Sequence, residues 1–62
     1  MIQYRVVLLA QGGRELSSGY LFSGDDHSAC ASAERLMQSN ANAVAVRVLD
    51  GERLVCSYER AA

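Results

Sequence analysis

The alternation of apolar and other residues on both sides of Asp50-Gly51 limits the folds open to this chain more than any other feature. The run "VAVRVL" precedes this turn, and the run "RLVCSY" follows it. Alternation with a period of two is typical of a strand with one buried face, and a D-G pair between two such runs indicates a hairpin. The last third of the chain is therefore expected to be a β-hairpin.

The register of this hairpin is predicted from the pairing that gathers the apolar residues on one face. A loop of two residues would place Val48 opposite Arg53, which mixes an apolar with a charged side chain. A loop of three residues, 49–51, places Val46 opposite Leu54 instead. Its glycine then takes the left-handed position of the turn, where a residue without Cβ is favoured. We therefore expect the three-residue loop.

The first half of the chain repeats this pattern around "QGG" at 11–13. A three-residue loop there pairs Tyr4 with Tyr20 and Ile2 with Phe22, so that apolar residues share one face. In this register all of these aromatic rings are expected on the inner face of the sheet.

A helix over about 26–40 is expected between the two hairpins. Asp25, Asp26 or Ser28 can accept hydrogen bonds from the free amides at its start, where negative charge is also favourable. The residues spaced by three and four, which should face the sheet, are Ala29, Ala33, Leu36, Met37 and Asn40.

The expected fold class is α+β, with the order ββαββ, a mainly antiparallel four-stranded sheet and one helix packed on one face. We expect one domain over 1–62, with strands at about 2–10, 15–23, 43–49 and 52–59. The strand order 2-1-3-4 is preferred because it makes every neighbouring pair antiparallel.

The sheet face turned away from the helix is expected to be unusually apolar. A solvated back face usually alternates more cleanly, and a chain of 62 residues has little core of its own. We therefore predict an interaction face that joins a homodimer or docks onto a larger protein; the alternative is a solvated face covered by long Arg stems. The predicted interaction face consists of Arg5, Val7, Leu9, Leu21, Ala45, Arg47, Arg53 and Val55.

The densest polar cluster is "GDDHSAC" at 24–30, where His27 could in principle serve as a base for Cys30. A metal site needs three or four converging ligands, and neither a second His nor a Cys pair in CxxC spacing is present. The cluster is better explained as a capped helix start. We predict no catalytic, metal or cofactor-binding residue, and no enzyme.

Cys30 and Cys56 are too few for a disulfide framework, and free cysteines are among the most buried residues. We expect both to be reduced, buried thiols in a cytoplasmic protein. No stretch approaches the ~20 apolar residues of a membrane span, so no membrane partner is expected. Met1 leads directly into a strand-like run rather than into a signal peptide.

Binding of nucleic acid through Arg5, Arg47 and Arg53 is the alternative function. The net charge of −1 argues against it, since nucleic-acid binders usually carry an excess of Lys and Arg. The aromatic rings, expected on the inner face, would also be unable to stack on bases. A non-enzymatic protein-interaction module is the leading hypothesis.

The segment "AERLMQ" and the closing hairpin "VAVRVLDGERLVCSY", with Asp50, Gly51 and a distal Tyr58, resemble small uncharacterised bacterial ββαββ families. The first hairpin followed by a helix also resembles, more loosely, the compact antitoxin domains of the HicB type, without their longer connection containing Pro and Gly. The resemblance brings no catalytic residue. A small accessory protein of bacterial or phage type would fit the hypothesis of an interaction module.

Overall fold

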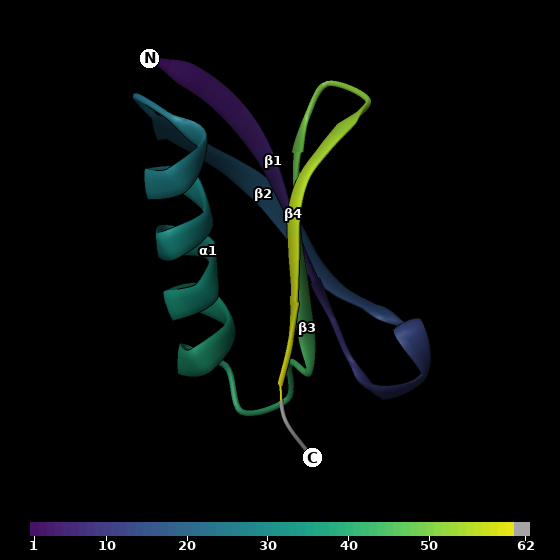
Figure 1. The fold of residues 1–62 in the computed structure, drawn as a ribbon. Helices are drawn as coiled ribbons and strands as arrows, with labels where there is room; N and C mark the ends of the chain where they lie inside the picture. The colour runs from purple at the N-terminus through teal and green to yellow at the C-terminus, as the bar shows by residue number, and fades with distance from the viewer. Residues whose placement is uncertain (61–62) are drawn as a thin grey trace.

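The computed structural model describes residues 1–60. Within them the elements are β1 (Ile2–Leu9), the short 3-10 turn η1 (Gln11–Gly13), β2 (Glu15–Ser23), α1 (Asp26–Ser39), β3 (Ala45–Asp50) and β4 (Arg53–Glu59). The strands form one antiparallel sheet in the order β2-β1-β3-β4, and α1 lies along one face of it (Figure 1). The α+β class, the ββαββ order and the preferred strand order are confirmed.

The core lies between α1 and the sheet face that it covers, which we call the inner face. Small residues on the helix let the two layers approach closely, while Met37 supplies volume from the helix and Tyr4 from the sheet. The fully buried residues include Tyr4, Val46 and Val48, none of which has any exposed side chain. The core cluster consists of Tyr4, Val6, Ala29, Ala33, Met37, Ala43, Val46 and Val48.

Both ends of α1 are capped by side chains. The Asp25 carboxylate accepts a hydrogen bond from the Ser28 amide at 2.7 Å, as expected for a helix start. At the other end, the Arg60 guanidinium donates to the carbonyl oxygens of Met37, at 2.6 Å, and Asn40, at 3.2 Å. A cation at this position also suits the negative end of the helix dipole. Arg60, which follows β4, therefore stabilises the C-terminal end of α1.

The helix is rotated relative to the expected orientation. Ala29, Ala33 and Met37 face the core as expected, but Leu36 is 47% exposed, so its predicted inward position is wrong. Cys30 is buried instead and is bonded to β4. The helix is thus turned toward β4, and Leu36 lies beside Gly19 and Leu21 of β2.

The register of the first hairpin differs from the expected one by a single residue over most of its length. The predicted register holds only beside the turn, where Leu9 pairs with Glu15. An irregularity between Leu8 and Leu9 adds one residue to β2, and beyond it Tyr4 pairs with Leu21. Because side chains alternate across a strand, this one-residue shift exchanges the two faces of β2. The predicted pairing of Tyr4 with Tyr20 is therefore wrong.

The expected three-residue loop of the second hairpin is wrong, because Asp50 pairs with Arg53 and leaves a turn of two residues. The turn consists of Gly51 and Glu52, and Gly51 has the positive φ of 63° that favours glycine. A shift between Val48 and Leu49 then brings Cys56 opposite Val48. The even-numbered residues of β3 still face the helix, as expected. At the start of β4, however, Arg53 and Leu54 lie on the opposite faces of the sheet from those expected.

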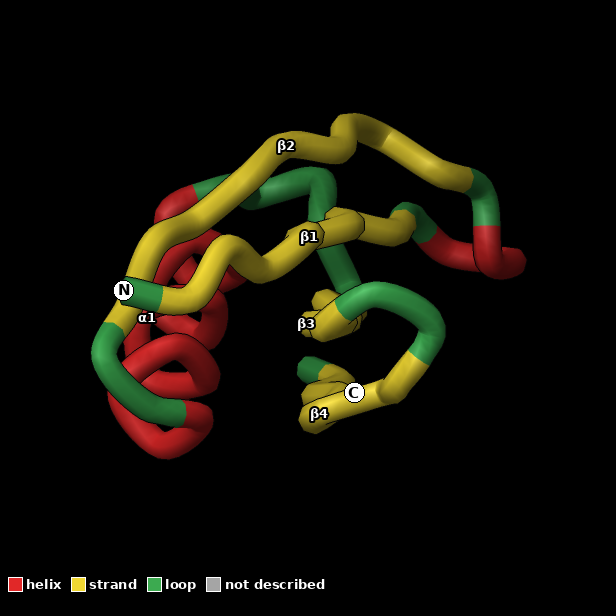
Figure 2. The backbone as a smooth tube through the Cα atoms, turned by 90° about the horizontal axis from the view of Figure 1, so that it is seen from above, coloured by secondary structure: helices red, strands yellow, loops and turns green. Residues whose placement is uncertain are grey.

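The other side of the sheet is not covered by a helix within residues 1–60, and we call it the open face. Seen from above, α1 lies on one side, while the tip of the β1–β2 hairpin curls around on the other (Figure 2). Cross-strand pairing places these residues on the open face: Gln3, Arg5, Val7, Leu9, Glu15, Ser18, Tyr20, Phe22, Ala45, Arg47, Leu49, Leu54, Ser57 and Glu59.

Candidate functional site

Large apolar side chains project from the open face. Tyr20 is 69% exposed, Phe22 is 58% exposed and Leu54 is 55% exposed. Further along the face, Val7 and Leu9 are nearly buried although they lie outside the core cluster. Exposed apolar groups gathered on one face are typical of an interaction surface.

Charged side chains are separated along the same face. Arg5 belongs to the same cross-strand row as Tyr20, whereas Glu15 and Glu59 flank Leu9 and Ala45, four residues further along β1. Arg47 lies between the two ends, opposite Val7. Neither arginine forms an ion pair with another residue in the described part of the chain. One end of the face is thus basic and aromatic, and the other is acidic.

A groove of about 510 Å³ opens at the acidic end of the face. Leu9 of β1 and Ala45 of β3 line it together with Ser57 and Glu59 of β4, the arginines Arg47 and Arg60 also line it, and the Gly12–Gly13 tip of the first hairpin closes one side. Figures 1 and 2 show this tip on the side of the sheet away from α1. The groove therefore combines apolar residues with charged residues of both signs.

The structure divides the residues of the predicted interaction face into two groups. Arg5, Val7, Leu9, Ala45 and Arg47 are paired across β1 and β3 and share the open face. Their role in an interaction stays a prediction.

Three of the predicted residues face the other way. Leu21 and Val55 pack against the core cluster, and Arg53 pairs with Asp26 at the start of α1, so their expected place on the back of the sheet is wrong. The bulge in β2 explains the change at Leu21, and the two-residue turn before β4 explains the change at Arg53, because each shifts the pairing by one residue; Val55 is the unpaired residue of the β4 bulge. The sequence argument missed Tyr20, Phe22 and Leu54 on the open face for the same reason.

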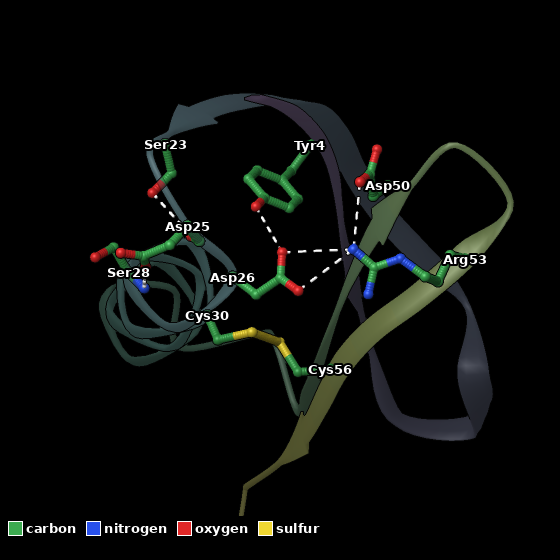
Figure 3. A network of polar contacts seen from close by, with 9 residues as sticks. All are labelled: Tyr4, Ser23, Asp25, Asp26, Ser28, Cys30, Asp50, Arg53 and Cys56. Carbon is green, nitrogen blue, oxygen red and sulfur yellow. Dashed lines mark hydrogen bonds and ion pairs between the residues drawn. A yellow bond between two sulfur atoms is a disulfide. The ribbon is translucent and has the colours of Figure 1, made fainter. Parts of the chain in front are cut away.

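A polar network joins the sheet to the start of α1 (Figure 3). The buried Tyr4 hydroxyl donates a hydrogen bond of 2.7 Å to the Asp26 carboxylate. The Arg53 guanidinium donates to Asp26 and to Asp50, at 3.3 Å in each case. The hydroxyl of the fully buried Tyr4 ring therefore has a hydrogen-bond partner, as buried polar groups require.

The network shifts the pKa values of its members. The hydrogen bond to Asp26, with burial, raises the pKa of Tyr4 to about 12. The same bond from Tyr4, helped by Arg53, lowers the pKa of Asp26. The Ser28 amide lowers the pKa of Asp25. All three shifts favour the ionisation states present at neutral pH.

The free energy of unfolding is expected to be greatest between about pH 4 and about pH 10. The contributions of Asp25 and Asp26 are complete above the ordinary carboxyl value of 3.8 and are lost as the pH falls through their lowered pKa values. The contribution of Tyr4 is complete below the ordinary value of 10.0 and is lost as the pH rises toward about 12. Chemical denaturation at a series of pH values measures the loss of stability at low pH and at high pH, which are the acidic and alkaline limbs of this profile.

The variant Tyr4→Phe is expected to remove the alkaline limb and to lower stability at neutral pH, because Asp26 loses a donor. Tyr58→Phe is the matched control, since this half-buried tyrosine lies on the same inner face, away from the network. An alkaline limb that survives in Tyr4→Phe would contradict the assignment.

Cys30 of α1 and Cys56 of β4 form a disulfide, so the expectation of two reduced thiols is wrong. Their Cα atoms lie 6.4 Å apart, within the usual range for a disulfide. No pattern in the sequence indicated this pair, because it forms only when the rotation of α1 brings Cys30 over the inner face of β4. The number of cysteines alone was a poor guide.

The polar cluster at the start of α1 brings no catalytic pair together. Cys30 is bonded to Cys56 and is therefore not a free nucleophile, and His27 is exposed. Among the residues described, no three His, Cys, Asp or Glu side chains converge as a metal site would require. Asp25 and Asp26 act instead as helix cap and ion-pair partner.

No helix within residues 1–60 has the length and apolar character needed to cross a membrane. Comparisons of this chain with protein-family models, with curated proteins and with solved structures find no match, so its resemblance to small bacterial ββαββ families stays a prediction.

Proposed function

We propose that the chain is a non-enzymatic protein-interaction module that works as a homodimer joined through its open face. One observation carries this proposal: the face is complementary to itself. Arg5, Tyr20 and Phe22 occupy one end of it, and Glu15 and Glu59 occupy the other.

A two-fold axis in the plane of the interface, running across the strands, would bring the basic end of one copy over the acidic end of the other. Isologous contacts of this kind need a surface patch that complements itself. In this arrangement the exposed rings and Leu54 at one end of each copy would cover the opposite end of the partner's face, where Leu9 and Ala45 lie between Glu15 and Glu59.

The size of the face also suits this use. A standard interface buries about 800 Å² on each partner, roughly a fifth of the accessible surface of this chain, which is 4193 Å². The face of a four-stranded sheet is broad enough to supply this area. A domain with a small core of its own gains stability when such a face is covered.

Reversing the charge of Arg5 is expected to weaken the dimer. The variant Arg5→Glu would place a carboxylate near the partner's acidic end, which should raise the dissociation constant at least about tenfold. The double variant Arg5→Glu/Glu15→Arg restores opposite charges in both halves of the interface and should recover most of the affinity. Sedimentation equilibrium over a range of concentrations measures these constants.

Arg35→Glu is the matched control, because Arg35 is an exposed arginine on α1, on the other side of the molecule. It makes the same charge change and should leave the dissociation constant unchanged. Equal effects of Arg5→Glu and Arg35→Glu would mean that the open face is not the interface. A wild-type chain that sediments as a 6.7 kDa monomer at all concentrations would overturn the homodimer.

Binding of single-stranded nucleic acid is a second candidate, now favoured by the exposure of Tyr20 and Phe22 beside Arg5. Exposed rings next to a cation are how many single-strand binders hold successive bases. The acidic end of the same face opposes this function, because Glu15 and Glu59 would repel a phosphate chain that followed the strands. Fluorescence anisotropy with labelled single-stranded RNA or DNA tests it: binding to phosphates weakens steeply as salt rises, whereas apolar docking does not.

A small accessory protein of bacterial or phage type that docks onto a larger protein stays part of the proposal, with the open face as the docking surface. The cytoplasmic setting stays a prediction too. Its support from reduced cysteines is lost, because disulfides persist mainly in oxidising compartments.

A further inference from the structure

The outer edge of β2 is an exposed sheet edge. β2 comes first in the strand order β2-β1-β3-β4, so within residues 1–60 only the side of it that faces β1 is paired (Figure 2). Alternate residues of an edge strand turn their N–H and C=O groups outward, where another strand can pair with them. From Ser17 to Ser23 the pairing with β1 is regular, so this stretch is an uninterrupted template.

This edge lacks the features that usually keep sheet edges from pairing, which are charged residues, proline and bulges. β4, the other edge strand, has Arg53 and Glu59 at its two ends and a bulge at Val55. In β2 the stretch "LSSGYLFS" at 16–23 contains neither a charged residue nor proline, and its bulge lies beside the turn. β2 is therefore the edge that is more open to an added strand.

Apolar side chains border this edge on both faces of the sheet. The exposed rings of Tyr20 and Phe22 project on the open face. On the inner face, the exposed Leu36 of α1 lies beside Gly19 and Leu21. A strand added to β2 would therefore have apolar neighbours on both of its faces, as a strand in a covered sheet does.

A hollow of about 240 Å³ lies on the inner face at the level of Gly19. Val6 and Leu8 of β1 line it together with Leu21 and Leu36. A Cβ atom at Gly19 would meet nothing within 4 Å, so β2 itself leaves this space open. In an antiparallel pair, the residue opposite Gly19 shares its face and lies about 5 Å away. A large aliphatic side chain at that position would enter the hollow.

We infer that the β2 edge binds an extended segment of another protein, which adds a strand to the four strands of this sheet. The segment is uncharged where it pairs with residues 17–23, and it carries a large aliphatic residue opposite Gly19. Main-chain hydrogen bonds supply the affinity, and the hollow supplies the specificity. The inference goes beyond the homodimer, because a two-fold axis across the strands leaves β2 at the outer edge of each copy.

A second copy of this chain fits the edge less well. The antiparallel pairing that matches the regular part of two β2 strands, 17–23, places Leu21 of the second copy opposite Gly19. Leu21 already packs against the core cluster of its own chain, so it is not free to fill the hollow. A register centred on Gly19 would place glycine opposite glycine and leave the hollow empty. The occupant is therefore a segment of different sequence.

A synthetic peptide tests this inference. In the probe, valine and threonine alternate around a central leucine, and both ends are blocked so that the peptide carries no charge. Titration into the ¹⁵N-labelled protein, followed by ¹H–¹⁵N correlation NMR, should shift the amides of Ser17 to Ser23 and leave those of Ser57 to Glu59 on β4 unchanged. Replacement of the central leucine by glycine should weaken binding at least about tenfold, because it removes the side chain that enters the hollow.

Two further probes separate strand pairing from apolar adhesion. One carries N-methyl groups on the central leucine and on every second residue from it, and the other carries them on the residues between. Each modification blocks the hydrogen-bond donors along one edge of the extended peptide and keeps its side chains. Only the probe that is blocked on the edge facing β2 should fail to bind.

Two variants test the hollow from the side of the protein. Gly19→Phe fills it from β2, and Leu36→Ala removes part of its wall. Binding of the leucine peptide should weaken at least about tenfold in Gly19→Phe and about threefold in Leu36→Ala. Ser57→Phe on β4 and Leu54→Ala on the open face are the matched controls, and both should keep the wild-type affinity. Circular dichroism checks that each variant is folded.

Arg5→Glu, which should dissociate the homodimer, should leave the peptide affinity unchanged, so that the two proposals fail separately. No amide shifts at about 1 mM peptide, shifts confined to other parts of the protein, or equal binding of the two N-methylated probes would overturn the inference. A folded Gly19→Phe variant that no longer self-associates in sedimentation equilibrium would mean that a second copy occupies the edge, and would overturn it as well.

Discussion

Removal of the Cys30–Cys56 disulfide is expected to lower the free energy of unfolding by about 3 to 4 kcal/mol. The two cysteines are 26 residues apart, and the bond between them restricts the unfolded chain by closing a loop of that length. A domain of 62 residues has a total stability of about 3 to 9 kcal/mol, so this loss is a large share of it. Guanidinium denaturation with and without a reductant measures the difference.

The double variant Cys30→Ala/Cys56→Ala is the control for this experiment. Its denaturation midpoint should match that of the reduced wild-type chain and should not respond to the reductant. A wild-type chain whose midpoint is the same in both conditions would contradict a disulfide that ties α1 to β4.

The variant Val46→Asp is expected to lower the free energy of unfolding by at least about 3 kcal/mol, enough to unfold much of the protein. Val46 has no exposed surface and belongs to the core cluster beneath α1, so the new carboxylate would have neither water nor a partner. Arg47→Asp, one residue along β3, changes an exposed side chain on the open face. At concentrations below dimer formation it should change the stability by less than about 0.5 kcal/mol.

Thermal unfolding followed by circular dichroism compares these two variants at low concentration. Val46→Ala serves as a further control, because it removes volume without adding charge and should cost less than Val46→Asp. If Val46→Asp and Arg47→Asp melted at the same temperature, the assignment of the two faces of β3 would be wrong.

Much of the fold could be predicted because the central strands follow regular alternation. Tyr4 of β1 and Val46 and Val48 of β3 were expected to face the helix, and all three are fully buried there. A capped helix start was expected with Asp25, Asp26 or Ser28 as the cap, and the structure shows Asp25 in this role.

The outer strands could not be predicted in the same way, because each contains a bulge. In β2 the extra residue exchanges the faces of the strand beyond it, whereas in β4 it restores the expected faces of Cys56 and Tyr58 after a two-residue turn has reversed those of Arg53 and Leu54. For this reason Leu21 was expected on the back of the sheet and is found packed against the core, whereas Tyr20 and Phe22 are found on the open face. The open face was expected, but its aromatic part was not.

Long-range contacts explain the other differences. The contact between Arg53 and Asp26 joins residues 27 positions apart, and that of Arg60 with the end of α1 joins residues 23 positions apart. Such contacts depend on how α1 is rotated over the sheet, which the helical periodicity alone leaves undetermined. The disulfide belongs to the same class, since it forms only when the helix brings Cys30 over β4.

The most direct test of the dimer through the open face is a dilution series followed by ¹H–¹⁵N correlation NMR. We expect concentration-dependent shifts for the amides of Arg5, Tyr20 and Arg47, with no change for Arg35 and Gln38 on the exposed side of α1. Shifts confined to α1 or to the outer edge of β2, or a spectrum that does not change with concentration, would contradict a dimer joined through the open face.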